Sequence, residues 1–454
     1  MSSVRDAGGS SNDAEEPGRV CPAGAADGRR APRPSGAQNA RPQTPVRTAA
    51  PARSSEEGFR FISPAEALEA LLSKLGPVGT EMVGWPDACG RVLAQPLLAD
   101  RPSPPCDVSA MDGYAVRLAD LARGSVDVAG DLLVGQPSPP LPEGKTLRIV
   151  TGAPIPAGAE AVVKREDVGE HGNHIIVGPE AARTQRGQYI RRAGENARAG
   201  EAIVPAGTVI MPPVMAAMAT FGAARVSVYR RVRVGVLVTG DELLPPEARP
   251  QPWQLRDANG PALTATIAGR PWCELRDCRH VADEPEPMSA ALSELLCDCD
   301  AVFITGGVSM GGRDHVPAVV RAAGAEVIFH KLPQRPGKPI LAAVGAAGQA
   351  ILGLPGNPVS VMATARRFGT PALAKRAGLT NPAAAPPAVA LTHDDGQRLN
   401  LWWYRPVRLR AAGLGELLDI RSSGDVAATA RSDGFIELPP GDGGPGPWPF
   451  YVWQ

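Results

Sequence analysis

Three short loops combine glycines with side chains that could hold a phosphorylated or metal-bridged ligand. Residues 239–243 read Thr-Gly-Asp-Glu-Leu, residues 305–312 read Thr-Gly-Gly-Val-Ser-Met-Gly-Gly, and residues 354–358 read Leu-Pro-Gly-Asn-Pro. Glycines let backbone amides close around an anion, and a helix N-terminus adds a favourable dipole. The carboxylates of Asp241, Glu242 and Asp314 suit a hard divalent cation if they meet. The chemistry predicted is the binding of a phosphate or oxyanion beside a metal ion.

Positive charge is concentrated between the second and third loops. Lys331 is followed by Arg-Pro-Gly-Lys-Pro at residues 335–339. Each feature alone has a simpler interpretation, since a Gly-rich turn is often only a turn and an Asp-Glu pair is often a solvated loop. The lysines could equally be ordinary surface charges. The simpler interpretations weaken because all of these segments flank strands of one predicted sheet.

Residues 230–378 show the alternation of strands and helices that positions such loops. This pattern predicts a three-layer α/β/α domain with a mostly parallel sheet. Ligands bind at the carboxyl ends of the strands in open sheets of this kind. The predicted strands are 232–238, 274–281, 301–304, 326–329, 340–343 and 350–352, and the predicted helices are 261–268, 287–296, 315–323 and 358–376.

The flanking regions predict further domains. Residues 98–205 show short apolar runs between Gly/Pro turns, which is typical of a β-rich domain. Residues 61–97 together with 206–229 are expected to form a helical unit. Its first helix follows a Ser63/Glu66 capping box, and a second helix at 215–221 is expected to pack on it.

The two ends of the chain differ. Residues 379–454 predict a C-terminal β domain after a Pro-rich linker at 381–387, with a strand over 401–404. Residues 1–60 are poor in branched apolar and aromatic side chains, which predicts a disordered extension with no assignable role.

Composition excludes several classes of function. Lys+Arg and Asp+Glu both number 47 among 454 residues, so no overall field favours nucleic acid, and the chain lacks an apolar run of membrane-spanning length. No secretory signal is recognisable, and seven cysteines are too scattered for a disulfide framework. A zinc site at Cys273, Cys278, Cys297 and Cys299 is disfavoured by its spacing. A cytoplasmic enzyme without nucleic-acid or membrane partners is expected.

The motifs together resemble the MoeA/gephyrin E-domain family. They are Ser-Ala-Met-Asp-Gly-Tyr-Ala at 109–115, Thr-Gly-Ala-Pro at 151–154, Thr-Gly-Asp-Glu at 239–242, Gly-Gly-Val-Ser at 306–309, Pro-Gly-Lys-Pro at 336–339 and Leu-Pro-Gly-Asn-Pro-Val-Ser at 354–360. Their order and spacing are those of the family. The resemblance covers the chain from about residue 61 to the C-terminus, and the first motif is its most specific part.

The resemblance implies a multidomain α/β plus β fold, with an α/β/α molybdopterin-binding domain and β-rich flanking domains in an elongated homodimer. It implies that adenylylated molybdopterin and molybdate are the substrates, with Mg²⁺ promoting hydrolysis of the adenylate and AMP released as molybdenum is inserted. A molybdopterin adenylyltransferase and molybdoenzyme chaperones are expected as further partners. Two alternatives remain: an adenylyltransferase, or a non-catalytic binding or scaffold protein.

The resemblance also implies roles for individual residues. The positions expected around the metal and nucleotide are Asp241, Glu242, Asp283 and Asp314. Those expected to hold molybdate are Arg335, Lys338, Ser360, Arg405 and Ser423. Asp112 and Thr151 are expected to reach the other subunit's α/β site, and Lys331 is expected to act in catalysis. The loop positions expected at the cofactor are Gly306, Gly307, Ser309, Pro339, Gly356 and Asn357.

Three positions depart from the family pattern. Asn196 stands where the family usually has Asp, and Gly312 stands where an acidic residue is common. Arg335 replaces a frequent Lys but keeps the charge and adds bidentate reach toward an oxyanion. Activity is expected to survive these changes, with metal affinity open to a shift.

Overall fold

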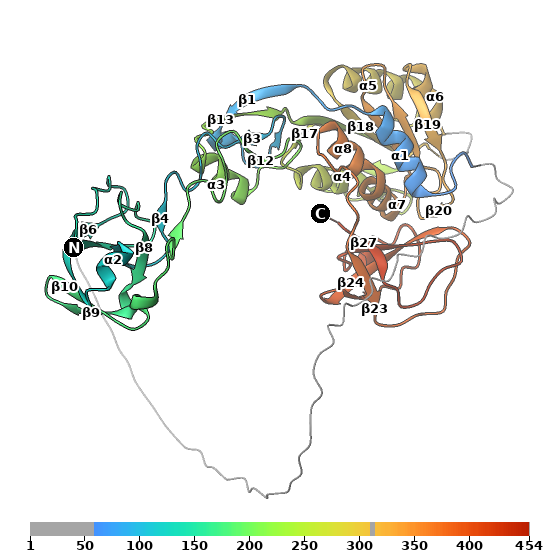
Figure 1. Ribbon diagram of the computed structural model, residues 1–454. Coiled ribbons are helices and arrows are strands. Elements are labelled where there is room, and N and C mark those ends of the chain that lie inside the picture. The colour runs from blue at the N-terminus through green and yellow to red at the C-terminus, as the bar shows by residue number, and fades with distance from the viewer. Residues whose placement is uncertain (1–58, 309–313, 454) are drawn as a thin grey trace, which may run out of the picture. The chain divides into compact units, whose positions relative to one another are not determined.

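A computed structural model describes residues 59–308 and 314–453 (Figure 1). Its α/β unit contains a six-stranded sheet in the order β17-β14-β18-β22-β21-β19. All strands run parallel except β21, which is antiparallel to both of its neighbours. The predicted mostly parallel sheet is confirmed. The bounds are β14 (Val232–Thr239), β17 (Cys273–Val281), β18 (Ala301–Thr305), β19 (Glu326–His330), β21 (Leu341–Val344) and β22 (Ala350–Leu354).

Helices cover both faces of this sheet, as a three-layer fold requires. Along β18, Ala301 and Phe303 pack in one apolar cluster while Val302 and Ile304 pack in the other. One cluster takes in α5 (Pro285–Asp298) and α6 (Val316–Ala322). The other takes in α1 (Pro64–Lys74), α4 (Asn259–Ala268), α7 (Pro358–Thr364) and α8 (Thr370–Arg376).

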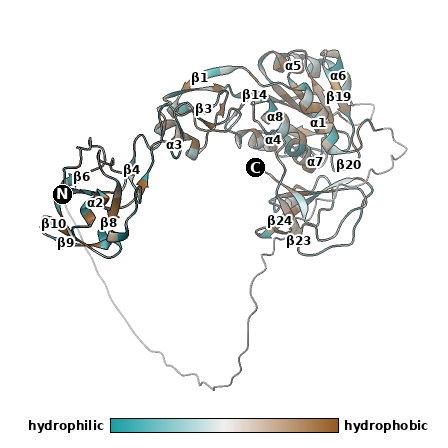
Figure 2. Cartoon of the chain, viewed as in Figure 1, coloured by the Kyte–Doolittle hydropathy of each residue, from teal (hydrophilic) through white to brown (hydrophobic). Residues whose placement is uncertain are grey.

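Helix α5 shows why these segments lie on a sheet. Its buried residues Met288, Ala291, Leu292 and Leu295 recur with the spacing that places them on one face of a helix. In Figure 2 the helix accordingly carries both hydrophobic and hydrophilic stretches. Burying that one face holds the helix on the sheet.

The helix predicted over 358–376 is not uniform. A π-helical segment, η4 (Ala365–Gly369), separates α7 from α8. Pro371, the second residue of α8, has no N–H to donate to the preceding turn, which weakens the regular α-helical ladder at this point. Gly369 also lies against the Phe303 ring, where a methyl group would come within 2.9 Å of Cζ. The sequence prediction of one continuous helix took account of neither the missing N–H of Pro371 nor the contact between Gly369 and Phe303.

Residues 61–97 and 206–229, which were expected to form one helical unit, are divided between the α/β core and a small β-containing unit. Ser63 Oγ does accept from Glu66 N–H at 3.2 Å, as expected of a cap. However, the buried face of α1, which includes Leu68 and Leu71, belongs to the α/β core. The remainder comprises two small sheets, one of three strands and one of two, with α3 (Pro212–Thr220), whose Met218 packs with apolar residues of these sheets rather than on α1. Its elements are β1 (Thr80–Gly84), η1 (Trp85–Asp87), β2 (Val92–Leu93), β3 (Leu97–Leu98), β12 (Ala202–Val204) and β13 (Arg225–Tyr229).

The β-rich unit has a core of its own. Its main sheet has six strands in the order β8-β5-β7-β6-β10-β9, a separate pair is formed by β11 and β4, and its two apolar clusters contain only residues from the range 114–190. Its elements are β4 (Val108–Ser109), β5 (Gly113–Val116), α2 (Leu118–Leu121), β6 (Ser125–Leu132), β7 (Lys145–Ile149), β8 (Ala161–Lys164), η2 (Arg165–Asp167), β9 (Val168–His171), β10 (His174–Val177), η3 (Ala181–Arg183) and β11 (Ile190–Arg191).

The C-terminal unit is a β-sheet that recruits a strand from the α/β unit. Strand β20 (Gln334–Arg335) pairs in parallel with β24 (Trp402–Ala411), which begins where the strand over 401–404 was predicted. The other elements are β23 (Ala388–Leu391), β25 (Leu414–Leu417), α9 (Val426–Thr429), β26 (Gly434–Leu438) and β27 (Trp448–Val452).

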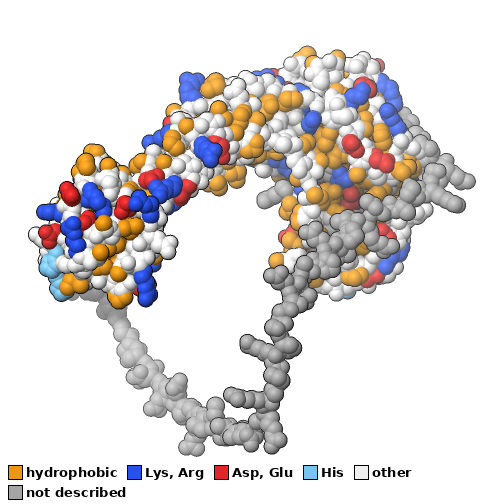
Figure 3. Space-filling view, in the orientation of Figure 1, with side chains coloured by type: hydrophobic (Ala, Val, Ile, Leu, Met, Phe, Trp, Pro, Cys, Tyr) orange, Lys and Arg blue, Asp and Glu red, His pale blue; other side chains and the backbone are white. Residues whose placement is uncertain are grey.

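The distribution of surface charge and the length of the helices can be compared with the expectations from composition. On the face seen in Figure 3, acidic and basic side chains are interspersed rather than segregated. Within residues 59–308 and 314–453, no helix is both long enough and apolar enough to cross a bilayer.

Candidate functional site

Three strand ends converge at the carboxyl edge of the α/β sheet. Gly306 N–H, just past β18, donates to the carbonyl of Leu354 at the end of β22 (3.3 Å), and Thr239 Oγ1, at the end of β14, donates to the carbonyl of Thr305 (3.1 Å). Gly306 has φ +90°, and a methyl group there would come within 2.5 Å of Thr239 Oγ1. A glycine at this position therefore lets the second loop approach the first.

The first loop holds the Asp-Glu pair and is followed in the chain by a short pair of strands. Asp241 and Glu242 are both exposed, just after β14. Gly240, at φ +141°, lies against the Glu242 carboxylate, and its carbonyl oxygen is 2.8 Å from His280 Nε2. The strands β15 (Leu243–Leu244) and β16 (Leu255–Arg256) follow.

An acidic cluster forms around the first loop. Asp283 N–H donates to Asp241 Oδ1 at 3.2 Å. Burial is the main cause that raises the pKa of Asp283, and His315 opposes it. The nearby carboxylates of Asp241, Glu242 and Asp314 raise that pKa further. The other three acidic residues predicted from the sequence therefore lie close enough to Asp283 to raise its pKa.

The chemistry of this cluster suits a hard cation. Oδ1 of Asp283 is buried and accepts no hydrogen bond within the described residues. A buried carboxylate oxygen beside further carboxylates is the kind of donor set whose negative charge Mg²⁺ neutralises. In residues 59–308 and 314–453, no three His, Cys, Asp or Glu side chains are arranged as a preformed metal site. The donor types fit a divalent cation, whereas their geometry is not that of a closed cage.

The third loop is tied to the same edge. Asn357 is the N-cap residue of α7 and Pro358 its first residue, as predicted, although the Asn357 side chain makes no capping hydrogen bond. Asn259, at the start of α4, donates from Nδ2 to the Gly356 carbonyl at 2.8 Å, while its buried Oδ1 has no hydrogen-bond partner within the described residues. Sequence analysis missed Asn259, whose only signal was a short polar residue opening a helix.

The basic segment 331–339 is braced from several sides. Lys331 has φ +73°, a left-handed conformation that is costly for a residue with a side chain. Its N–H donates to Ile340 O at 2.8 Å. Gly337, at φ +93°, packs so closely on Thr364 that a methyl group would come within 2.4 Å of Cγ2. Such constraints fix the backbone that carries Lys338 and its neighbour Pro339.

A buried hydrogen-bond chain joins this segment to the C-terminal sheet. Tyr404 donates from its hydroxyl to Gln334 Oε1 at 2.8 Å, and Gln334 Nε2 donates to Gly337 O at 3.0 Å. The register of β20 and β24 places Arg335 opposite Trp403. The exposed Arg335 is thus held on a short strand between two units. Sequence analysis did not identify Gln334 or Tyr404, because their pairing spans 70 residues.

The other predicted molybdate residues lie on neighbouring segments. Ser360 is 3% exposed in the first turn of α7. Val359 N–H, one residue earlier, donates to the carbonyl of Ser423 at 3.1 Å, which places Ser423 beside that turn. Arg405 lies on β24, two residues after Trp403. Its guanidinium is already bound by Asp395, a residue that sequence analysis did not identify.

The β-rich unit presents the pair Asp112 and Thr151. The Thr151 N–H and hydroxyl donate to Asp112 Oδ1 at 2.7 and 2.8 Å, which lowers the pKa of Asp112. Gly113 follows, and a methyl group there would come within 1.9 Å of Val163 O. Ser109 closes the turn by a hydroxyl bond to Met111 O at 2.6 Å. The motif therefore builds a tight turn that displays one ionised carboxylate.

The structure also places two further residues named from the sequence, Asn196 and Gly307. Asn196 accepts from Arg191 Nη2 at 2.7 Å, so its side chain is engaged within the β-rich unit. Gly307, at φ +58°, would bring a methyl group within 3.4 Å of Asp283 Oδ1, so the second loop lies against the acidic cluster. Ser309 and Gly312 lie outside the described residues.

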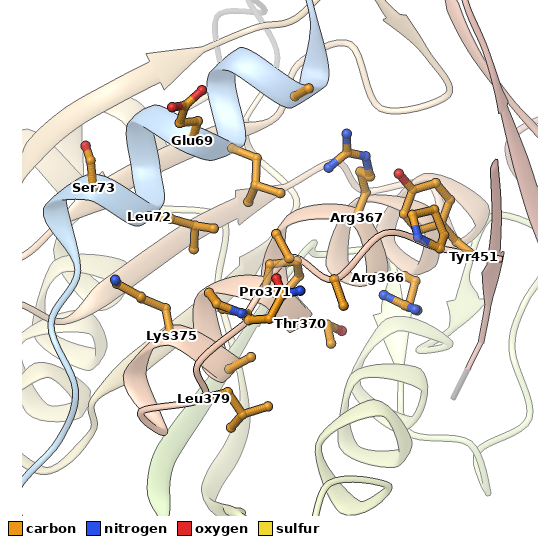
Figure 4. Close-up of a pocket in the computed structure, with 18 of the residues that line it drawn as sticks. Glu69, Leu72, Ser73, Arg366, Arg367, Thr370, Pro371, Lys375, Leu379 and Tyr451 are labelled. Atoms are coloured by element: carbon orange, nitrogen blue, oxygen red, sulfur yellow. The ribbon is translucent and has the colours of Figure 1, made fainter. Parts of the chain in front are cut away.

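A separate groove of about 570 Å³ contains none of the predicted site residues. It lies between α1 and the η4–α8 segment, with Tyr451 at one end (Figure 4). Glu69, Leu72 and Lys375 are among its lining residues. This groove is therefore separate from the strand ends where the predicted site residues lie.

Comparison with known proteins places these features in one family. Residues 62–222 match the family model of the MoeA N-terminal region (domain I and II), and residues 235–375 match that of a probable molybdopterin binding domain. The molybdopterin molybdenumtransferase of Synechococcus elongatus is 34% identical over 395 residues, covering 84% of this chain and 96% of the relative. That of Haemophilus influenzae is 35% identical and covers 66% and 74%.

The chain belongs to the molybdopterin molybdenumtransferase family. A MoeA protein of Pyrococcus horikoshii has a similar fold, with a TM-score of 0.70, 27% identity, and coverage of 87% of this chain and all of that one. Membership makes the chain a transferase of molybdenum cofactor biosynthesis. The adenylyltransferase and scaffold alternatives are not favoured, because the curated relatives that match most of this chain carry the transferase name.

Proposed function

We propose that this chain inserts molybdenum from molybdate into adenylylated molybdopterin and releases AMP, with Mg²⁺ as the divalent cation. Family membership supports the molybdenum transfer. The observation that carries the site assignment is the convergence of an acidic cluster and a braced basic segment on loops around one α/β unit. The acidic set would meet the metal and phosphates, and the basic set would meet the oxyanion.

The acidic residues act on the phosphoanhydride side of the reaction. Asp241, Glu242, Asp283 and Asp314 would hold the cation, whose bound charge neutralises the phosphates during cleavage. The backbone amide of Gly307 and the helix start at Gly356–Asn357 would orient the phosphates, while Gly306 keeps the second loop close to the first. Asn259 would keep the third loop in place through its bond to the Gly356 carbonyl.

The basic residues act on the molybdenum side. Lys338 and Arg335 would attract molybdate, a tetrahedral dianion, to the segment that Gln334 and Tyr404 brace. Ser360 and Ser423 would donate hydrogen bonds to its oxygens, and Arg405 would offer a bidentate guanidinium. Fixing the oxyanion there would bring it to the dithiolene sulfurs in a defined orientation. Unlike these residues, Lys331 would act on the phosphate side, where it would add a positive charge near the leaving phosphate.

Asp112 and Thr151 would complete the site of a second copy in a homodimer. The β-rich unit has its own apolar clusters, so it can act as a separate lobe. Exposed apolar side chains lie near the pair: Met111 is 39% exposed and Val134 is 61% exposed. Leu255 is 59% exposed and donates its N–H to Glu242 O, so an apolar surface adjoins the acidic loop as well. Exposed apolar surface beside polar groups is typical of interfaces.

The cellular setting belongs to the same proposal. The described cysteines are free thiols, which suits a reducing cytoplasm. A molybdopterin adenylyltransferase is the expected supplier of the adenylylated substrate, and molybdoenzyme chaperones are the expected recipients of the product.

The test is a measurement of AMP release from adenylylated molybdopterin with and without molybdate. Release that depends on both molybdate and Mg²⁺ is the expected result. Formation of the adenylylated compound from ATP would instead indicate an adenylyltransferase. Binding of the compound without any turnover would indicate a scaffold protein.

A further inference from the structure

The guanidinium of Arg405 is already engaged by a carboxylate of the same chain. Nη1 donates to Asp395 Oδ1 at 3.0 Å and Nη2 donates to Asp395 Oδ2 at 2.5 Å. The Arg405 side chain is 11% exposed and its guanidinium lies 4.2 Å from the centre of the Trp403 ring. Stacking on one side and a bidentate carboxylate at its edge hold this cation in one orientation.

Asp395 belongs to the loop between β23 and β24. Its side chain is 24% exposed, and Oδ1 also accepts from Gln397 N–H at 3.1 Å. The Arg405 guanidinium is the main cause that lowers the pKa of Asp395, with the Gln397 N–H adding to the effect and burial opposing it. The carboxylate is therefore a charged partner of Arg405 at neutral pH.

The pair stands beside the segment that would receive the oxyanion. Arg335 is opposite Trp403 in the β20–β24 register, and Arg405 follows two residues later on β24, which puts its side chain on the same face as Trp403. An anion that is held by Arg335 and reaches Arg405 meets a guanidinium whose Nη1 and Nη2 already donate to the Asp395 carboxylate. Two anions cannot both use that edge of the guanidinium.

We propose that Asp395 is an internal competitor for the oxyanion, which must displace its carboxylate from Arg405 in order to bind there. The inference rests on the proposed function, because it assumes that Arg405 contributes to the molybdate site. A dianion gains more from the guanidinium than the single charge of Asp395 does, whereas a monoanion gains little. Only an anion that binds Arg405 more strongly than the Asp395 carboxylate does can displace that carboxylate. This competition favours dianionic oxyanions over monoanions.

Asp395→Asn is the decisive variant. Asparagine keeps Oδ1 as an acceptor for Gln397 N–H, so the loop retains its turn while the charge is lost. Asp394→Asn is the matched control, because the adjacent Asp394 pairs with the more exposed Arg398. Molybdate binding to the full chain is measured by equilibrium ultrafiltration, with metal analysis of the free fraction. Tryptophan fluorescence and melting temperature check that each variant is folded.

The expected result is that Asp395→Asn tightens molybdate binding about three- to tenfold, the effect of releasing one partly buried ion pair. Asp394→Asn should leave binding unchanged. Nitrate, a monoanion, should compete with molybdate at lower concentrations in Asp395→Asn than in the wild-type chain. Unchanged or weaker molybdate binding in Asp395→Asn would overturn the inference, because the carboxylate would then merely brace Arg405.

Arg405→Gln separates this inference from the proposed function. If Arg405→Gln weakens molybdate binding while Asp395→Asn does not strengthen it, the competitor role fails and the site assignment stands. If Arg405→Gln leaves molybdate binding unchanged, Arg405 is not part of the site and both statements fail.

Discussion

At the scale of single residues, charge and its surroundings decide what each group can do. Asp283 combines a buried oxygen with three carboxylate neighbours, so it gains most from a cation. Arg405 is at the opposite extreme, because its charge is already balanced. The sequence identified both residues through the family pattern. It could not show that Asp283 lies among other carboxylates while Arg405 is paired with one, since such contacts form only in the fold.

The first prediction concerns Asp314, whose carboxylate contributes to the field at Asp283. Asp314→Ala should lower turnover at least about tenfold through lost charge neutralisation around the cation. Melting temperature should change little, because a loop carboxylate contributes little to the core. The control is Glu294→Ala, which removes an exposed carboxylate of α5 paired with Arg279. Turnover of Asp314→Ala equal to wild type at saturating Mg²⁺ would refute the assignment.

The second prediction concerns Lys338. Lys338→Ala should raise the molybdate concentration needed for half-maximal AMP release, while binding of the adenylylated substrate stays near normal. Tungstate, of the same shape and charge, should compete with molybdate in the wild-type chain. Lys145→Ala, at an exposed lysine of β7, is the control. Lost nucleotide affinity with an unchanged molybdate requirement would mean that the two sub-sites are reversed.

At the scale of elements, local patterns predicted the α/β unit well and the joins between units poorly. The buried strand at 232–238 and the loops at its neighbours' ends follow from apolar runs and glycines, which are local signals. The docking of α1 on the α/β core, the π-helical segment η4 and the recruitment of β20 by β24 depend on residues far apart in the chain. Such contacts leave no periodic mark in a sequence.

The third prediction tests the join between η4 and the C-terminal sheet. Arg367 donates from Nε to Glu437 Oε2 at 2.6 Å, and both side chains are over 90% buried. Glu437→Ala should destabilise the C-terminal unit by about 3–5 kcal/mol, because it leaves a buried guanidinium unpaired. Urea unfolding followed by tryptophan fluorescence measures this, since Trp402, Trp403, Trp448 and Trp453 lie in that unit.

An exposed ion pair provides the comparison for Glu437. Glu416 pairs with Arg410, and these side chains are 33% and 52% exposed. Glu416→Ala should shift the unfolding midpoint only slightly, because exposed ion pairs are worth about 0–1 kcal/mol. Equal shifts for the two variants would show that the Arg367–Glu437 pair does not hold the join together.

At the scale of the whole molecule, the proposed function requires two chains for each site. The β-rich unit carries Asp112 and Thr151, and the α/β unit carries Asp241. Asp112→Ala and Asp241→Ala should therefore each be nearly inactive as homodimers. After subunit exchange, about half of the dimers are mixed, and roughly a quarter of wild-type sites should be restored under C₂ symmetry.

The subunit-exchange experiment requires proof of exchange and a control mixture that should stay inactive. Subunit exchange is demonstrated with differently tagged chains before activity is measured. A mixture of Asp241→Ala with Asp314→Ala should not recover activity, because both changes fall on the same α/β unit. Proven exchange of Asp112→Ala with Asp241→Ala without recovered activity would show that Asp112 does not serve a partner's site.

The central claim is that one site couples AMP release to molybdenum insertion. The most direct measurement is a single turnover with excess enzyme, in which released AMP and pterin-bound molybdenum are quantified in the same sample. The account predicts one molybdenum bound per AMP released, with both falling together in Lys338→Ala at limiting molybdate. AMP release at the full rate without molybdate, or without molybdenum in the pterin product, would contradict it.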